Sequence, residues 1–265
     1  MNVKVTDLVR MEIAKMRRSQ ILLVGIIALA LCPALQYGTH QITAAQEPFA
    51  MADLFRSVIW GNVQMFLPIS FVMIGGFVIS RETSDDTLKS LLTVPVSYPM
   101  LLTGKLMAVG LLSVAFGLYS CAVTLVTGCA AGLEWGSAAE LAGSCAQNIA
   151  VSVITYGVTM PLIVLFGGRP GAYLGGSIAA FFCGYSILFF KNGVLRSVYP
   201  FLAAFALVGF DTAEFNGAKV NADIGFSMLS MAVVWIAAVL LVVSARPPER
   251  RQRRSARIGT GRARS

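Results

Sequence analysis

Charged side chains are scarce in this chain of 265 residues. Asp, Glu, Lys and Arg make up 13% of it, hydrophobic residues make up 56%, and the mean hydropathy is +0.73. Soluble domains contain about 25% charged residues. The composition therefore argues strongly against a soluble protein, and it excludes a disordered chain and a coiled coil.

Sequence motifs that would support catalysis are missing as well. The chain has one histidine, His40, and neither paired metal ligands nor an HExxH protease motif. A phosphate-binding loop of the form GxxxxGK[ST] is absent, because Leu106 follows Gly104 and Lys105, and Pro99 stands where the first glycine would be. We therefore expect this chain to bind no metal or cofactor itself and to have no ATPase site.

Six runs without any charged residue are long enough to cross a bilayer, which takes about 20 apolar residues per helix. We expect helices, because the strands of a β-barrel would alternate polar and apolar residues. Pro68 and Pro161 lie inside two of the runs and predict kinks. The runs are 21–38, 59–80, 106–133, 141–166, 172–190 and 224–245.

The absence of charge inside these runs disfavours a proton- or sodium-coupled carrier, which needs an ionisable or coordinating group at mid-membrane. The amides that remain inside are Asn62 and Gln64 in the second run and Gln147 and Asn148 in the fourth. They could form hydrogen bonds between helices. They could also line a path for an amphipathic substrate, and the sequence leaves both interpretations open.

The basic residues predict how the chain is oriented. With six spans both termini share one side, and that side collects 17 of the 21 Lys and Arg residues. The positive-inside rule then places both termini in the cytoplasm of a multi-pass membrane protein. Eight of these arginines lie in the tail 246–265, which we interpret as a topology determinant in contact with anionic lipid and not as a nucleic-acid site.

Two segments outside the runs are predicted to be structured. In residues 1–20, Val5, Val9, Ile13 and Met16 recur at nearly helical spacing, as in an amphipathic helix at the membrane interface; a basic leader that only sets topology is the alternative. Residues 201–210 are apolar but span only half of a bilayer. They predict either a helix that enters the outer leaflet and returns, or an outer helix packed on its neighbours.

The segment between the second and third runs is the most informative one. Thr83 and Asp86 have the spacing of a capping box, and Pro95 would end the helix that they begin. Leu88, Leu91 and Leu92 would form one apolar face of that helix. Docking to a protein partner fits its acidic start better than contact with an anionic membrane surface.

This order of segments resembles the permease subunits of ABC-2 type transporters, in particular those of lantibiotic immunity and bacitracin resistance. The resemblance is carried by residues 80–97, which read SRETSDDTLKSLLTVPVS, by Gly104-Lys105-Leu106, and by the leader 12–18, which reads EIAKMRR. It implies an all-α fold with three parts: an elbow helix in 1–20, a six-helix membrane domain in 21–245 with an outer re-entrant helix before the last span, and a basic tail in 246–265. It also implies that a coupling helix contacts the ATPase through Glu82, Asp85, Asp86, Thr87, Leu88, Lys89, Leu91 and Leu92.

The function expected from the resemblance is export of an amphipathic antimicrobial peptide or other antibiotic across a bacterial cell membrane. Two copies of a separate ATPase subunit would bind ATP and Mg, and a second permease copy or a paralogue would complete the pore. The rival hypotheses are a non-transporting membrane anchor or sensor that recruits a cytoplasmic protein, and a membrane-embedded enzyme. No arrangement of acids, bases or nucleophiles in the sequence supports an enzyme.

Overall fold

The computed structural model describes residues 5–43, 48–84, 97–190, 194–217 and 223–245. These residues form helices joined by short turns, and no strand occurs among them. Six helices are long and apolar enough to cross a membrane. The all-α, six-span architecture expected from the sequence is therefore confirmed.

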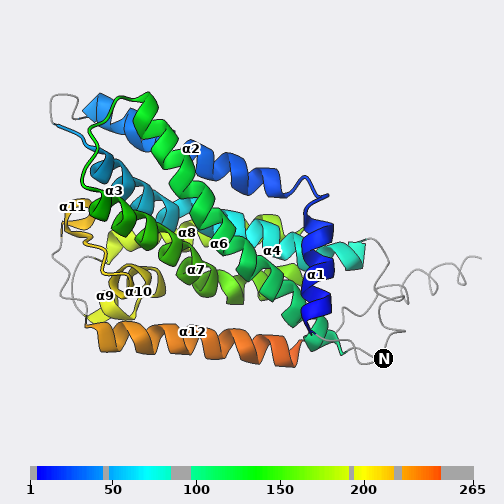
Figure 1. Ribbon diagram of the computed structural model, residues 1–265. Helices are drawn as coiled ribbons and strands as arrows, with labels where there is room; N and C mark the ends of the chain where they lie inside the picture. The colour runs from blue at the N-terminus through cyan, green and yellow to red at the C-terminus, as the bar shows by residue number, and fades with distance from the viewer. Residues whose placement is uncertain (1–4, 44–47, 85–96, 191–193, 218–222, 246–265) are drawn as a thin grey trace, which may run out of the picture.

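The six long helices run back and forth along the length of the molecule (Figure 1). The helix α1, the last residues of α4 and the end of α12 lie together at one end of the molecule, and the short helices α9 to α11 lie at the other. The long elements are α2 (Leu22–Thr43), α3 (Met51–Gly61), η1 (Asn62–Phe66), α4 (Leu67–Ser84), α6 (Tyr98–Ala130), α7 (Ala138–Gly167), α8 (Ala172–Tyr185), η2 (Ser186–Phe189) and α12 (Ile224–Ser244). The short ones are α1 (Val5–Met16), α9 (Val194–Val198), α10 (Pro200–Leu207) and α11 (Ala213–Asn216).

The second span, Met51–Arg81, is one continuous stretch of 31 helical residues made of α3, η1 and α4 up to Arg81. Its irregularity is the π-helical turn η1, which ends two residues before Pro68. Proline has no N–H to donate to the preceding turn, so the wider turn lies where the regular hydrogen bonding fails. The fourth span carries Pro161 inside the unbroken helix α7.

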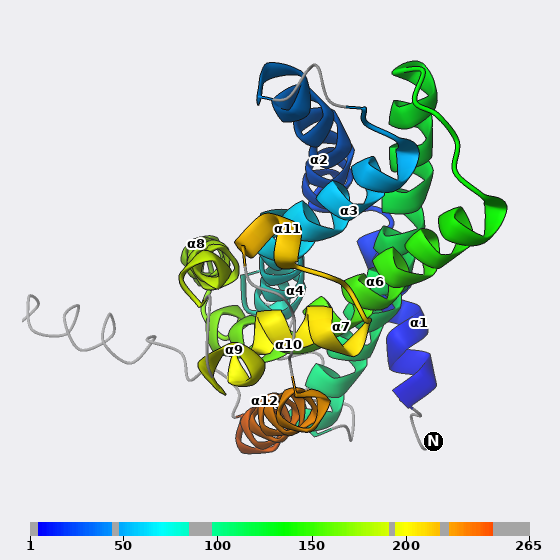
Figure 2. The same ribbon diagram turned by 90° about the vertical axis from the view of Figure 1, so that its left-hand side faces the viewer.

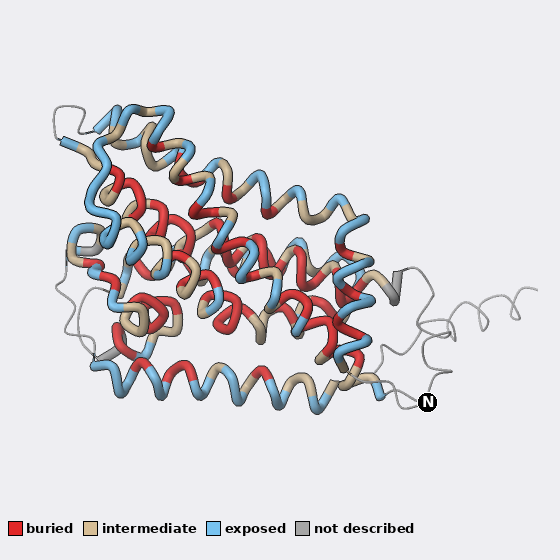
Figure 3. Tube along the Cα trace, in the orientation of Figure 1, coloured by how far each residue is buried: buried red, intermediate tan, exposed pale blue. Residues whose placement is uncertain are grey.

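This second span is also the centre of the molecule. Within its most apolar 18-residue window, 72% of the residues are buried in the protein, compared with 22% for α2 and 28% for α12. The buried positions concentrate in the middle of the bundle, while α2 and α12 lie along its outside and are mostly exposed or half-buried (Figure 3). The exposed residues of α2 and α12 include large aliphatic ones such as Leu31 and Leu240. A membrane would cover those outer faces.

The first helix packs on the protein through most of the apolar face that the sequence suggested for the bilayer. Val9 and Met16 are buried, together with Leu8, while Ile13 is exposed. Leu8 lies against Gly104 in α6, where any side chain larger than hydrogen would meet it. The helix therefore exists as predicted within residues 1–20, and its position at a membrane interface stays a prediction.

The outer segment contains the short helix that residues 201–210 predicted. The side chains of Phe201 and Phe205 in α10 are buried. Seen along the bundle, α10 lies between α9 and α7, with α12 alongside (Figure 2). The helix is thus packed on its neighbours, and entry into the outer leaflet stays a prediction.

Candidate functional site

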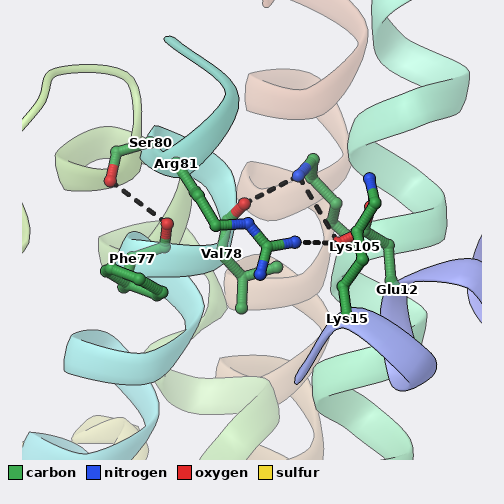
Figure 4. A network of polar contacts seen from close by, with 7 residues as sticks. All are labelled: Glu12, Lys15, Phe77, Val78, Ser80, Arg81 and Lys105. Carbon is green, nitrogen blue, oxygen red and sulfur yellow. Dashed lines mark hydrogen bonds and ion pairs between the residues drawn. The ribbon is translucent and has the colours of Figure 1, made fainter. Parts of the chain in front are cut away.

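A cluster of charged side chains joins three helices at the end of the bundle that carries α1. The carboxylate of Glu12 lies 3.0 Å from Lys15 Nζ through Oε1, and Oε2 lies 3.6 Å from both an Arg81 guanidinium nitrogen and Lys105 Nζ. Figure 4 shows these side chains converging from α1, α4 and α6. We call Glu12, Lys15, Arg81 and Lys105 the Glu12 cluster.

The most buried members of the Glu12 cluster are a carboxylate and an ammonium group. The side chain of Glu12 is 2% exposed and that of Lys105 is 3% exposed. Lys105 also donates a 2.7 Å hydrogen bond to the backbone carbonyl of Val78 in α4. Burial of a charge is costly unless it is paired and hydrogen-bonded, so these contacts hold α1, α4 and α6 in a fixed arrangement.

The Glu12 cluster lies at the base of the segment predicted to contact an ATPase. Residues 85–96 connect the end of α4 to Ser97 ahead of α6, and Arg81 and Lys105 flank this connection in the sequence. Glu82 lies in the last turn of α4, but its side chain lies outside the described part of the chain. The remaining predicted contact residues also fall outside the described residues: Asp85, Asp86, Thr87, Leu88, Lys89, Leu91 and Leu92.

One detail of that prediction is wrong. Thr83 cannot cap a new helix, because α4 continues through Thr83 to Ser84. The charged residues Arg81 and Glu82 end the apolar run in the sequence, but the helix continues past them.

Two of the four amides predicted to line a substrate path meet in the interior. The Nδ2 atom of Asn62 donates to Ser120 Oγ at 2.9 Å and to Asn148 Oδ1 at 3.1 Å, and Asn148 Nδ2 donates to Ser120 Oγ at 3.0 Å. Asn62 and Asn148 are fully buried. The contacts join η1, α6 and α7, so in this conformation these amides hold helices together.

The two glutamines lie apart from this cluster and are half-buried. Gln147 Nε2 donates to the backbone carbonyl of Val208, which follows α10, at 3.2 Å. The backbone of Gln64 lies directly against Gly184 in α8. The structure therefore brings two of the four amides together, and a substrate path along them stays a prediction.

Hydroxyl groups contribute contacts that sequence reasoning missed. Ser120 is central to the amide cluster, Ser152 Oγ donates to the carbonyl of Ser113 at 2.8 Å, and the hydroxyl of Tyr156 donates to the carbonyl of Leu106 at 2.6 Å. The signal was available, because Ser113 and Ser120 are seven residues apart and face the same side of α6. Small polar residues at that spacing in an apolar run mark a helix–helix interface.

Aromatic rings close the opposite end of the bundle. The indole of Trp60 in α3 stacks on Phe205 of α10 and on Phe215 of α11, with ring centroids 5.3 Å and 5.1 Å apart. An ion pair between Arg56 and Glu214, 2.8 Å long, also joins α3 to α11. We call α10, α11 and these contacts the outer cap.

Arg196 of α9 is buried beneath the outer cap. Its guanidinium donates a hydrogen bond to the hydroxyl of Thr212. Burial lowers the pKa of this guanidinium, and the nearby carboxylate of Asp211 raises it.

No group of three or more His, Cys, Asp or Glu side chains placed to hold a metal ion occurs among the residues that the structure describes.

Comparison with known protein families identifies a match that covers most of the chain. The family model for the ABC-2 family transporter protein matches residues 8–187. The match begins in α1 and ends in η2, so it includes every member of the Glu12 cluster and the amide cluster. No curated protein matches this chain.

Proposed function

The chain belongs to the ABC-2 transporter family, and from that membership we propose that it exports amphipathic antimicrobial compounds. As a member of that family it is a multi-pass permease subunit that works with an ATP-binding cassette ATPase subunit. The proposal adds the substrate class, the direction of transport and the residues that contact the ATPase. The observation that carries it is the match over residues 8–187, which includes both helices that flank the connection 85–96.

We propose an amphipathic peptide antibiotic, such as a lantibiotic or bacitracin, as the substrate. The charge-free runs offer aromatic, methionine and neutral amide surface and no fixed charge that would select a small ion. Gln64 and Gln147 are half-buried, whereas Asn62 and Asn148 are fully buried and would become accessible only after η1, α6 and α7 separate.

We propose that residues 82–92 dock on the ATPase subunit. Two ATPase copies would bind ATP with Mg, and a second permease copy or a paralogue would complete the membrane domain. Closure of the ATPase pair would then move the docked segments as rigid bodies and switch the permease between its inward- and outward-open states. The Glu12 cluster supports this location, because it braces both helices that leave the docked segment.

The proposed location is the bacterial cell membrane, with both termini in the cytoplasm. The end of the bundle that carries α1 also carries Arg81, Lys105 and Arg169, and the outer cap lies at the opposite end. The excess of basic residues at the first end supports its assignment to the cytoplasm.

Docking can be tested by co-purification. The tagged chain, extracted in mild detergent from its native cells, is compared with the double variant Leu88→Asp/Leu91→Asp and with the control Ser90→Asp/Thr93→Asp. The control places two carboxylates on the opposite face of the same predicted helix. Mass spectrometry is expected to find an ATPase subunit with the wild type and the control, and to miss it with the leucine variant.

Substrate class is tested by growth in nisin and in bacitracin. Cells that carry the chain with its ATPase subunit should tolerate more of at least one compound than cells whose ATPase cannot hydrolyse ATP. Equal inhibition of both strains by both compounds would refute the substrate class.

In the co-purification experiment, an ATPase subunit retained by the leucine variant would refute the docking site.

A further inference from the structure

We infer that Glu12 is a positioning residue through which movement of the ATPase-docking segment is passed to α1. This inference rests on the proposed function, because it requires an ATPase to act on residues 82–92. It goes beyond that function because it assigns the transmission of this movement to one carboxylate that lies outside residues 82–92. In the geometry on which it stands, one buried acid is shared by basic groups from three helices.

The carboxylate of Glu12 is buried. A carboxylate that is 2% exposed is stable in its charged form only while cations surround it. Arg81 supplies one from the last turns of α4, and Lys105 supplies another from the second turn of α6. Displacement of α4 or α6 by an ångström or two would therefore pull on Glu12, since separating these charges in a buried site costs energy.

The groups around the Glu12 carboxylate also bind one another. Lys105 binds Glu12 and the carbonyl of Val78 with the same ammonium group, so α4 and α6 share one side chain at their bases. The neighbouring Gly104 brings the backbone of α6 close to Leu8 of α1. The three helices α1, α4 and α6 are therefore held together at the end of α4 and the start of α6, the two helix ends that residues 85–96 connect.

The remaining faces of α1 are more exposed. Arg10, Met11, Ala14 and Arg17 are exposed, and Lys15 is only partly buried. Packing of Leu8, Val9 and Met16 holds α1 near α6, but apolar contacts do not specify direction as a buried ion pair does. Replacing the Glu12 carboxylate by a neutral group should leave α1 packed on α6. It should also allow α4 to move without α1.

The experiment compares Glu12→Gln with Arg10→Gln, which removes a charge from the exposed side of the same helix, and with the double variant Glu12→Gln/Lys105→Gln. Each chain is purified with its ATPase subunit in lipid nanodiscs. Spin labels at Ala14→Cys in α1 and Ala139→Cys at the far end of α7, both exposed positions, report the distance along the molecule. The exposed Cys129 is replaced by Ala in all variants to prevent stray labelling.

The wild type and Arg10→Gln should bind the ATPase, hydrolyse ATP and change the label distance when ATP and vanadate trap the closed state. Glu12→Gln should bind the ATPase and hydrolyse ATP but lose that change in distance. The double variant removes both buried charges, so it should accumulate at least as well as Glu12→Gln while still lacking the change.

Three outcomes would overturn the inference. A normal distance change in Glu12→Gln would show that the carboxylate transmits nothing. Recovery of the change in the double variant would show that Glu12 only neutralises Lys105. Failure of both variants to accumulate would make Glu12 a folding determinant. A wild type that binds no ATPase would instead refute the proposed function, and the inference would fall with it.

Discussion

Gly184 marks one of the closest approaches between two backbones in the bundle. A methyl group there would overlap the backbone carbonyl oxygen of Gln64, whereas a methyl group at Gly175 in the same helix would meet nothing within 4 Å. Alanine is otherwise about 1 kcal/mol better than glycine in a helix. The two substitutions should therefore act in opposite directions.

We predict that Gly184→Ala lowers the stability by about 1–3 kcal/mol, because α8 must move away from η1. Gly175→Ala should leave it unchanged or raise it slightly. Thermal unfolding of the two variants in one detergent measures the difference. Equal transition temperatures would contradict the close packing of α8 on the second span.

The amide cluster allows a second comparison. Asn148→Ala removes the hydrogen bonds to Asn62 and Ser120 and should cost about 1–3 kcal/mol, because it leaves the Asn62 amide buried without that partner. Gln147→Ala removes one hydrogen bond of a half-buried residue and should cost less than about 1 kcal/mol. The readout is the unfolding temperature of each variant, and a larger loss from Gln147→Ala would exclude a structural role for the amide cluster.

Individual residues were predictable where they are conspicuous. Asn62 and Asn148 stand out as amides in apolar runs, and they do meet. Ser120 did not stand out, because serine hydroxyls often bond within their own helix. The burial of Glu12 could not be foreseen, because its spacing from Lys15 also fits an exposed pair, and only the fold brings Arg81 and Lys105 to it.

At the scale of the elements, all six charge-free runs correspond to long helices, but several helices begin or end at other residues than the runs do. The helix α6 begins at Tyr98, eight positions before the predicted run, since Lys105 is accommodated inside by a carbonyl and a carboxylate. The second span begins at Met51 instead of residue 59, and Asp53 receives a 3.0 Å hydrogen bond from the N–H of Ala50 at its start. Charge marks the end of an apolar run and not the end of a helix.

The outer cap yields a prediction about elements. Trp60→Ala should loosen α10 and α11, because it removes the ring that stacks on both Phe205 and Phe215. Glu214→Gln breaks a surface ion pair whose two side chains are 41% and 53% exposed, and such pairs contribute about 0–1 kcal/mol.

Hydrogen–deuterium exchange of residues 200–216 can separate these contributions. Faster exchange is expected in Trp60→Ala and exchange close to that of the wild type in Glu214→Gln. If the charge variant exchanged faster than the aromatic one, electrostatics and not ring stacking would hold the outer cap.

At the scale of the whole molecule, the predicted orientation rests on the distribution of basic residues. Truncation after Pro248 removes seven arginines and leaves ten of the seventeen basic residues on the predicted cytoplasmic side, against four on the other. The truncated chain should still insert correctly and bind its ATPase subunit. Labelling of a cysteine placed at Ala139, tested from either side of intact cells, gives the orientation, and loss of ATPase binding despite correct insertion would assign the tail a further role.

The number of spans and the all-helical class could be predicted for the whole molecule, because bilayer thickness and backbone hydrogen bonding dictate them. The packing order could not. That the second span forms the centre while α2 and α12 lie outside depends on which faces fit together, and hydropathy is high for all six helices.

The central helix has a thermodynamic consequence. Its 31 residues extend about 46 Å, so one continuous helix includes both Arg81 in the Glu12 cluster and Trp60, which contacts the outer cap. If ATP binding at one end changes the free energy of opening at the other, linkage requires the reverse effect to be equal in size. A compound that holds the outer cap open would then alter the affinity of the ATPase for ATP by the same factor, although it never touches that subunit.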